Sequence, residues 1–284
     1  MELRTDLALE VREVKGDIGG VLWEEERQGD ITVSRMDVTT PAGARSLGKP
    51  MGKYVTVELP ALTDNAFRTD ERFEAVSGEL SRLVPDDGEI LVIGLGNRAI
   101  TPDALGPKTA AKIVATRHIA GELKRSAGFD CLRPCSVLAP GVLGQTGIEV
   151  LELLRAICKS ISPAAVIVID ALASRKLSRL GRTVQLSDAG ISPGAGVGNN
   201  RPEISTKTLG VPVISVGVPT VVEASVLARD LMGHDEQTRE NGEPMIVTPR
   251  EIDLLIDRAS RLLALSINSV LHPKIDPIDL LSVT

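Results

Sequence analysis

Two apolar runs in this chain each lead to an aspartate. Residues 90–94 run into a loop that carries Asp103, and residues 165–169 end directly on Asp170. Short β-branched runs followed by helical patterns are typical of buried parallel strands, and open α/β sheets hold their reactive groups outside the carboxyl ends of such strands. Within a carboxyl pair, the ionised group takes a proton from water and the protonated group supplies one to a leaving amine. The pair therefore points to peptide hydrolysis without a metal or a nucleophilic side chain.

Both aspartates also have a structural interpretation, because an aspartate at a strand end often caps the next helix. Two observations count against capping. Asp103 lies in a loop with glycines at some distance on both sides, and Asp170 follows five apolar residues whose burial should raise its pKa. The carboxyl pair is the primary hypothesis, with capping as its alternative.

A glycine motif favours a different class of protein, a nucleotide-binding module. Residues 94–99 (GLGNRA) satisfy the G-x-G-x-x-A pattern and follow an apolar run. The true fingerprint opens a helix at once, whereas Pro102 would interrupt such a helix and Asp103 would repel a phosphate. Neither a P-loop nor a G-x-S-x-G nucleophile motif occurs in the sequence.

Cysteines and histidines are weaker candidates for chemistry. The cysteines match neither a redox motif nor a zinc site and indicate buried thiols in a reducing cytosol: Cys131, Cys135 and Cys158. The histidines are expected at helix surfaces or in the tail: His118, His234 and His272. A cysteine protease that uses Cys135 with His118 is an alternative, although a buried small apolar residue is the favoured interpretation of Cys135. No metal site and no cofactor is predicted.

Composition limits the possible partners. The 284 residues carry a formal net charge of -6, whereas binding to duplex DNA needs clustered Lys and Arg. Aromatic residues make up only 2% of the chain, so stacking on bases is not expected either. No apolar run approaches the ~18 residues of a membrane span, and Met1 is followed by charged and polar residues instead of a signal peptide. The sequence predicts a cytoplasmic protein without nucleic-acid or membrane partners.

The elements that must position these side chains follow two patterns. Residues 7–87 alternate like strands at 31–33 and 54–57, with glycines and prolines between them, and are expected to form a layer of edge strands. From residue 88 onward, strands alternate with helices. Further strands are predicted at 136–139, 183–186, 213–218 and 245–247, and apolar residues at helical spacing predict helices over 150–158 and 252–263. The expected fold class is α/β, with a mostly parallel, helix-flanked sheet in a single domain over residues 1–284.

Two local features refine this prediction. Three Thr-x-x-Glu sequences resemble capping boxes and mark expected helix starts at Thr146, Thr220 and Thr248. Residues 188–205 are polar, rich in glycine and too long for an ordinary connection, so we expect a mobile lid there.

Five segments of the sequence resemble the germination protease family of spore-forming bacteria. They are 92–97 (VIGLGN), 101–107 (TPDALGP), 139–147 (APGVLGQTG), 169–174 (IDALAS) and 192–201 (SPGAGVGNNR). The resemblance implies a fold similar to that of hydrogenase maturation proteases. It also implies a homotetrameric endopeptidase that degrades small acid-soluble spore proteins in the spore core during germination. The family's catalytic aspartates fall on Asp103 and Asp170.

The same resemblance implies a zymogen that removes its own N-terminal segment. Residues 4–10 (RTDLALE) are similar to the family's processing site, so we expect cleavage between Asp6 and Leu7 and a propeptide over residues 1–6. Cleavage after an acidic residue requires a subsite for it, for which the cationic candidates are Arg98, Arg175, Lys176 and Arg201. Residues 190–198 are expected to line the cleft and to supply N–H groups to the oxyanion. The alternative functions are a nickel-dependent hydrogenase maturation protease and a nonenzymatic nucleotide-binding module.

Overall fold

The computed structural model describes residues 5–64, 69–119, 132–198, 201–232 and 245–281. The strands of this part of the chain are β1 (Val21–Gln28), β2 (Ile31–Val38), β3 (Gly52–Glu58), β4 (Ile90–Gly94), β5 (Cys135–Leu138), β6 (Ala165–Ser174), β7 (Thr183–Ser187), β8 (Val213–Glu223) and β9 (Ile246–Val247). The helices are α1 (Ala8–Lys15), α2 (Pro41–Leu47), α3 (Glu71–Ser81), α4 (Leu105–Ala110), α6 (Leu143–Thr146), α7 (Val150–Ile161), α8 (Thr206–Leu209), α9 (Ala224–Met232), α10 (Ile252–Leu271) and α11 (Pro277–Leu281). Short 3-10 turns are η1 (Thr101–Asp103), η2 (Leu177–Arg179) and η3 (Ala195–Val197).

One mixed sheet joins these strands in the order β1-β2-β3-β7-β8-β6-β4-β5, with β9 paired to β8. Strands β8, β6, β4 and β5 pair in parallel, because the connections between them carry helices. Strands β1, β2, β3 and β7 pair antiparallel and extend the sheet beyond β8. The α/β class is thus confirmed, with parallel pairing concentrated in four adjacent strands. The N-terminal strands are continuous with the rest, since β3 pairs directly with β7.

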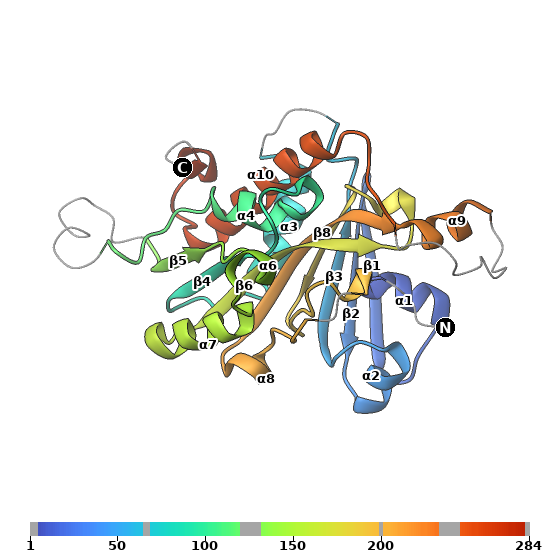
Figure 1. Ribbon diagram of the computed structural model, residues 1–284, viewed down its shortest axis with the longest axis horizontal. Helices are drawn as coiled ribbons and strands as arrows, with labels where there is room; N and C mark the ends of the chain where they lie inside the picture. The colour runs from blue at the N-terminus through green and yellow to red at the C-terminus, as the bar shows by residue number, and fades with distance from the viewer. Residues whose placement is uncertain (1–4, 65–68, 120–131, 199–200, 233–244, 282–284) are drawn as a thin grey trace.

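Helices cover both faces of the sheet (Figure 1). Strand β6 shows why: Ile167 and Ile169 belong to the core that includes α3, α4 and α10, whereas Val166 and Val168 belong to the core that includes α7. Successive residues of a strand point to opposite faces, so a buried strand is apolar at every position. A third, smaller core packs α1 and α2 against β2 and β3. The carboxyl end of β6 therefore lies between two covered faces of the sheet.

The apolar patterns locate the elements better than the capping patterns do. All eight predicted strands are present, and the two predicted helices correspond to α7 and α10. The three capping boxes are wrong as helix starts: Thr146 ends α6, Thr220 lies inside β8, and α10 begins only after Glu251. Strand β1 was not predicted, because five consecutive charged or polar residues in it, from 24 to 28, hide its alternation.

The cysteines and histidines differ in how deeply they are buried. Cys135 and Cys158 are buried free thiols, as predicted, and burial raises the pKa of Cys135 to about 12. His118 is exposed, but His272 is fully buried, against expectation, and its Nδ1 accepts a hydrogen bond from the Arg133 N–H at 3.3 Å. Cys131 and His234 lie outside the described residues. A buried thiol held in its neutral form is a poor nucleophile, which argues against the cysteine protease alternative.

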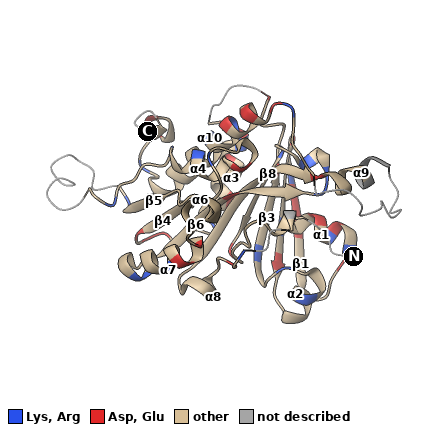
Figure 2. Ribbon diagram, in the orientation of Figure 1, with Lys and Arg blue, Asp and Glu red and all other residues tan. Residues whose placement is uncertain are grey.

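Charged residues lie mainly on the helices and outer strands (Figure 2). The central strands β4, β6 and β8 are almost entirely apolar, with Asp170 as an exception in β6. Among the described helices, none combines the length and apolar character needed to cross a membrane.

Gly94, the last residue of β4, lies against the backbone of α4, and a Cβ atom there would clash with the carbonyl oxygen of Gly106. Replacing Gly94 with alanine should lower the free energy of unfolding by about 1–3 kcal/mol, the usual result of overpacking. Gly78, exposed within α3, has open space around it, so Gly78→Ala should be neutral or stabilising by up to about 1 kcal/mol. Urea unfolding of both variants measures the contrast, and equal midpoints would contradict it.

Candidate active site

Asp170 lies within the last half of β6, at the carboxyl side of the parallel strands. Its side chain is only 6% exposed, and its Oδ1 accepts a hydrogen bond from the N–H of Ala171 at 2.9 Å. Burial raises the pKa of Asp170 well above its usual value of 3.8, and the nearby Asp103 and Asp6 raise it further. This environment therefore favours the protonated form of Asp170.

Asp103 is brought to the same place by the loop after β4. Gly96 has a φ of 112°, and a Cβ atom there would clash with the Asp103 backbone, so glycine is needed for the loop to fold back. Asp103 Oδ2 accepts a hydrogen bond from the Asn97 N–H at 2.7 Å. The Thr220 hydroxyl of β8 donates to the Pro102 carbonyl at 2.9 Å and holds η1 in position. The glycines of the nucleotide-like motif thus shape an aspartate loop and do not open a helix.

The two carboxyl groups differ in their environments. Burial raises the pKa of Asp103, and the hydrogen bond from Asn97 opposes this rise. Asp103 adds to the rise at Asp170, which is the more deeply buried of the two. When two interacting carboxyl groups share one region, the proton resides on the group that is harder to ionise. Asp170 is therefore the member of the pair that is harder to ionise.

A pocket of about 170 Å³ opens beside Asp170 on the same face of the sheet. Leu172, two residues along β6 from Asp170, lines it, as do Gly217 of β8 and Gln185 of β7. Asp170, Gly217 and Gln185 form one row across three adjacent strands, because Asp170 pairs with Gly217 and Gly217 pairs with Gln185. Two strand spacings separate the ends of the row by about 9–10 Å. Glycine in the middle of the row gives room to the Leu172 side chain, which lies where a Cβ atom of residue 217 would be.

Asp6 is one of the residues that line this pocket. Its backbone N–H donates to the Ala173 carbonyl at 3.0 Å, and its carboxyl group accepts from the N–H groups of Ala173 and Gly196 at 2.8 and 2.9 Å. Its carbonyl oxygen accepts from Lys49 Nζ at 3.1 Å and from Gln185 Nε2 at 3.2 Å. Burial raises the pKa of Asp6, while the N–H of Ala173, the Lys49 ammonium and the N–H of Gly196 act against this rise.

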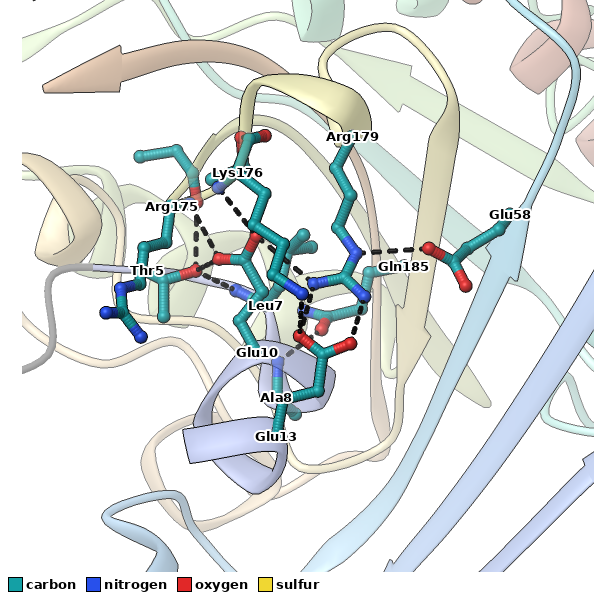
Figure 3. A network of polar contacts seen from close by, with 12 residues as sticks. Thr5, Leu7, Ala8, Glu10, Glu13, Glu58, Arg175, Lys176, Arg179 and Gln185 are labelled. Atoms are coloured by element: carbon teal, nitrogen blue, oxygen red, sulfur yellow. Dashed lines mark hydrogen bonds and ion pairs between the residues drawn. The ribbon is translucent and has the colours of Figure 1, made fainter. Parts of the chain in front are cut away.

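Residues after Asp6 are anchored by helix α1 and a buried arginine (Figure 3). The Arg179 side chain, 6% exposed, pairs with Glu13 at 2.6 Å, Glu58 at 3.1 Å and Glu10 at 3.4 Å. Burial acts to raise the pKa of Glu13, but hydrogen bonds from Arg179 and Lys176 outweigh it and lower that pKa to about 2. Leu7 and Ala8 are fully buried at the start of this helix. The bond between Asp6 and Leu7 is thus held at both ends.

Of the four predicted cationic residues, Arg98 is exposed, and the other three make contacts elsewhere. The backbone N–H groups of Arg175 and Lys176 donate to Glu10, Lys176 also pairs with Glu13 at 2.8 Å, and Arg201 pairs with Glu149 at 3.2 Å. Within segment 190–198, Gly196 directs its N–H to the carboxyl group of Asp6, and Ile191 forms a bridge with Ile204. None of these contacts reaches the Asp6 carbonyl.

Lys49 and Gln185 were not among the residues selected from the sequence. Lys49 lies in the loop between α2 and β3, and Gln185 is a polar residue in a buried strand. A glutamine among apolar strand residues was the available signal. In the described ranges, no three His, Cys, Asp or Glu side chains are grouped as ligands for a metal ion.

Comparison with known proteins defines the class of this α/β protein. A peptidase family described as Germination protease matches residues 2–237, so the fold with its pair of carboxyl groups is that of a protease. Germination proteases from Clostridium perfringens and Caldanaerobacter subterraneus subsp. tengcongensis are each 40% identical to this chain, covering 95% of it and 95% and 94% of those proteins. The germination protease of Priestia megaterium is 40% identical over 85% of this chain and 70% of that protein. The chain belongs to the germination protease family.

A solved structure gives a more distant likeness. The NiFe hydrogenase maturation protease HycI from Thermococcus kodakarensis superposes with a TM-score of 0.41 at 17% identity, over 68% of this chain and 98% of that chain.

The raised pKa of Asp170 predicts a pH-dependent stability. A carboxyl group whose pKa is raised on folding contributes its full stability below its unfolded value and loses it as the pH rises through the folded pKa. Asp170→Asn removes this loss, so the variant should gain in melting temperature relative to wild type as the pH rises from 4 to 8. Each kcal/mol corresponds to roughly 2–4 °C. Asp253→Asn, at an exposed site of α10, serves as the matched control in thermal denaturation. A difference in melting temperature between Asp170→Asn and wild type that stays constant from pH 4 to 8 would contradict the prediction.

Proposed function

We propose that this protein is an endopeptidase that cleaves small acid-soluble spore proteins after acidic residues during spore germination. Asp103 and Asp170 activate water in the reaction. Membership of the germination protease family supports a protease that acts at germination. The main observation in support of this mechanism is that Asp170 is buried near a pocket that Asp6 lines and that both Asp103 and Asp6 raise its pKa.

The proposed reaction divides the work according to protonation. The Asp103 carboxylate takes a proton from water, and the water oxygen forms a bond to the substrate carbonyl carbon. Asp170 donates its proton to the amide nitrogen as the C–N bond breaks. The products are a carboxylate on one fragment and an amine on the other. One carboxyl group has then gained a proton and the other has lost one, and exchange with solvent restores the pair.

The same chemistry on the chain's own Asp6–Leu7 bond would make this protein a self-processing zymogen with residues 1–6 as its propeptide. The support is positional: Asp6 lies in the pocket beside Asp170, and its carbonyl is held by two side-chain donors. The homotetramer and the location in the spore core are further parts of the proposal. They rest on the resemblance to the family.

Asp103→Asn and Asp170→Asn should each lower kcat on a small acid-soluble spore protein by about 10²–10⁴, the range lost with a general acid or base. Asparagine keeps the size of the side chain but can neither take nor supply the proton. Hydrolysis is followed by mass spectrometry, with circular dichroism to show that each variant is folded. Asp253→Asn should keep wild-type activity, and substantial activity in either site variant would overturn the pair.

N-terminal sequencing tests the processing step. Wild-type protein held at mildly acidic pH should acquire Leu7 as its new N-terminus, because the Asp6–Leu7 bond is the one placed at the pocket. Asp103→Asn should keep its original terminus under the same conditions. Activity that appears without any change of terminus would show that processing is not required.

A further inference from the structure

The contacts of Asp6 suggest how the protein could recognise an acidic residue before the cleaved bond. Four donors surround this residue: the N–H groups of Ala173 and Gly196, Lys49 Nζ and Gln185 Nε2. Two of them meet the side-chain carboxyl group and two meet the backbone carbonyl oxygen. The first two donors can recognise an acidic side chain, and the other two can polarise the carbonyl group of the bond that follows it.

We propose that these four groups form the substrate subsite for the acidic residue and the oxyanion site of the reaction, with Asp6 bound there as an internal substrate. The N–H groups of Ala173 and Gly196 select the acidic side chain. Lys49 and Gln185 stabilise the negative charge that develops on the carbonyl oxygen. This inference rests on the proposed function, since it assigns partners to the bond that Asp103 and Asp170 would hydrolyse.

Gln185 is placed to hold the substrate backbone on both sides of the bond. Its Nε2 donates to the Asp6 carbonyl at 3.2 Å, and its Oε1 accepts from the Ala8 N–H at 2.8 Å. The amide thus spans the Asp6–Leu7 bond. Gln185 also stands at one end of the row whose other end is Asp170, with Gly217 between them. Gly217 and the Leu172 side chain that packs over it therefore lie between the proposed proton donor, Asp170, and the carbonyl donor, Gln185.

Lys49 supplies the cation of this site. Its ammonium donates to the carbonyl oxygens of both Thr5 and Asp6 at 3.1 Å. Burial lowers the pKa of Lys49, while the carboxylates of Asp6 and Glu10 act to raise it. The attraction between an ammonium group and a carbonyl oxygen becomes stronger when that oxygen becomes anionic in the transition state. Removal of one such donor typically lowers kcat by about 10²–10³.

The acidic side chain is recognised by backbone groups instead of arginine or lysine side chains. These N–H groups come from two separate segments, β6 and η3, and hydrogen bonds from main-chain N–H groups to an ionised carboxylate are stronger than those to a neutral group. Gly196 is required for this contact, because a Cβ atom there would overlap the Asp6 carboxyl group. Glycine at this position therefore sets the depth of the subsite.

Four variants test the subsite in the full-length protein. Lys49→Met should lower kcat on a small acid-soluble spore protein by about 10²–10³ with a smaller change in KM. Gly196→Ala should reduce the preference for Glu over Gln before the cleaved bond at least tenfold, measured with two substrates that differ only at that residue. Asp6→Asn should slow the appearance of the Leu7 terminus by about tenfold or more, and Asp6→Glu should restore it to within a few-fold.

Controls separate this inference from the proposed function. Gly144→Ala, at an open position of α6, should leave the Glu preference unchanged, and thermal denaturation shows whether Gly196→Ala is folded. Activity retained by Asp103→Asn would overturn the proposed function itself. If Asp103→Asn is inactive, wild-type kcat in Lys49→Met overturns the oxyanion site. An unchanged Glu preference in Gly196→Ala, or equal processing of Asp6→Asn and Asp6→Glu, overturns the acidic subsite.

Discussion

Placing a carboxyl group out of water at the end of a parallel strand costs free energy whenever that group ionises, and the rest of the site is arranged around this constraint. Burial and two further carboxyl groups raise the pKa of Asp170 and so disfavour a negative charge there. Asp103 is more exposed and accepts the Asn97 N–H, which opposes the rise of its own pKa. Two identical side chains thus differ in their tendency to ionise because their environments differ.

Backbone geometry makes this arrangement possible. Gly96 lets the loop after β4 turn back so that Asp103 approaches β6, and Gly217 gives room to the Leu172 side chain in the row between Asp170 and Gln185. Both positions lie where a Cβ atom would meet other parts of the chain. The site depends on where side chains are missing as much as on where they are present.

The strands that position the two aspartates could be predicted from the sequence. The apolar runs at 90–94 and 165–169 are long enough to identify buried strands, and β4 and β6 pair side by side, so aspartates after or within them converge. Thr220 misled the prediction because a β-branched residue before a glutamate suits a strand as well as a capping box. Gln185 and Lys49 could not be assigned, since their positions follow from the antiparallel pairing of β3 with β7 and of β7 with β8. Spacing along the chain does not encode that register.

The anchoring of α1 has a consequence for turnover. Arg179, which is buried, forms ion pairs with three glutamates, Glu10 and Glu13 of α1 and Glu58 of β3, whereas Thr5 and Asp6 are held by their own hydrogen bonds. Scission at this point would release the short fragment and leave Leu7 and Ala8 in place, with Ala8 still bound to Gln185. The new N-terminus at Leu7 would then remain beside Gln185, where the amine side of a substrate would bind. A substrate polypeptide would have to displace this terminus, so the stability of α1 would affect how readily the processed enzyme binds its next substrate.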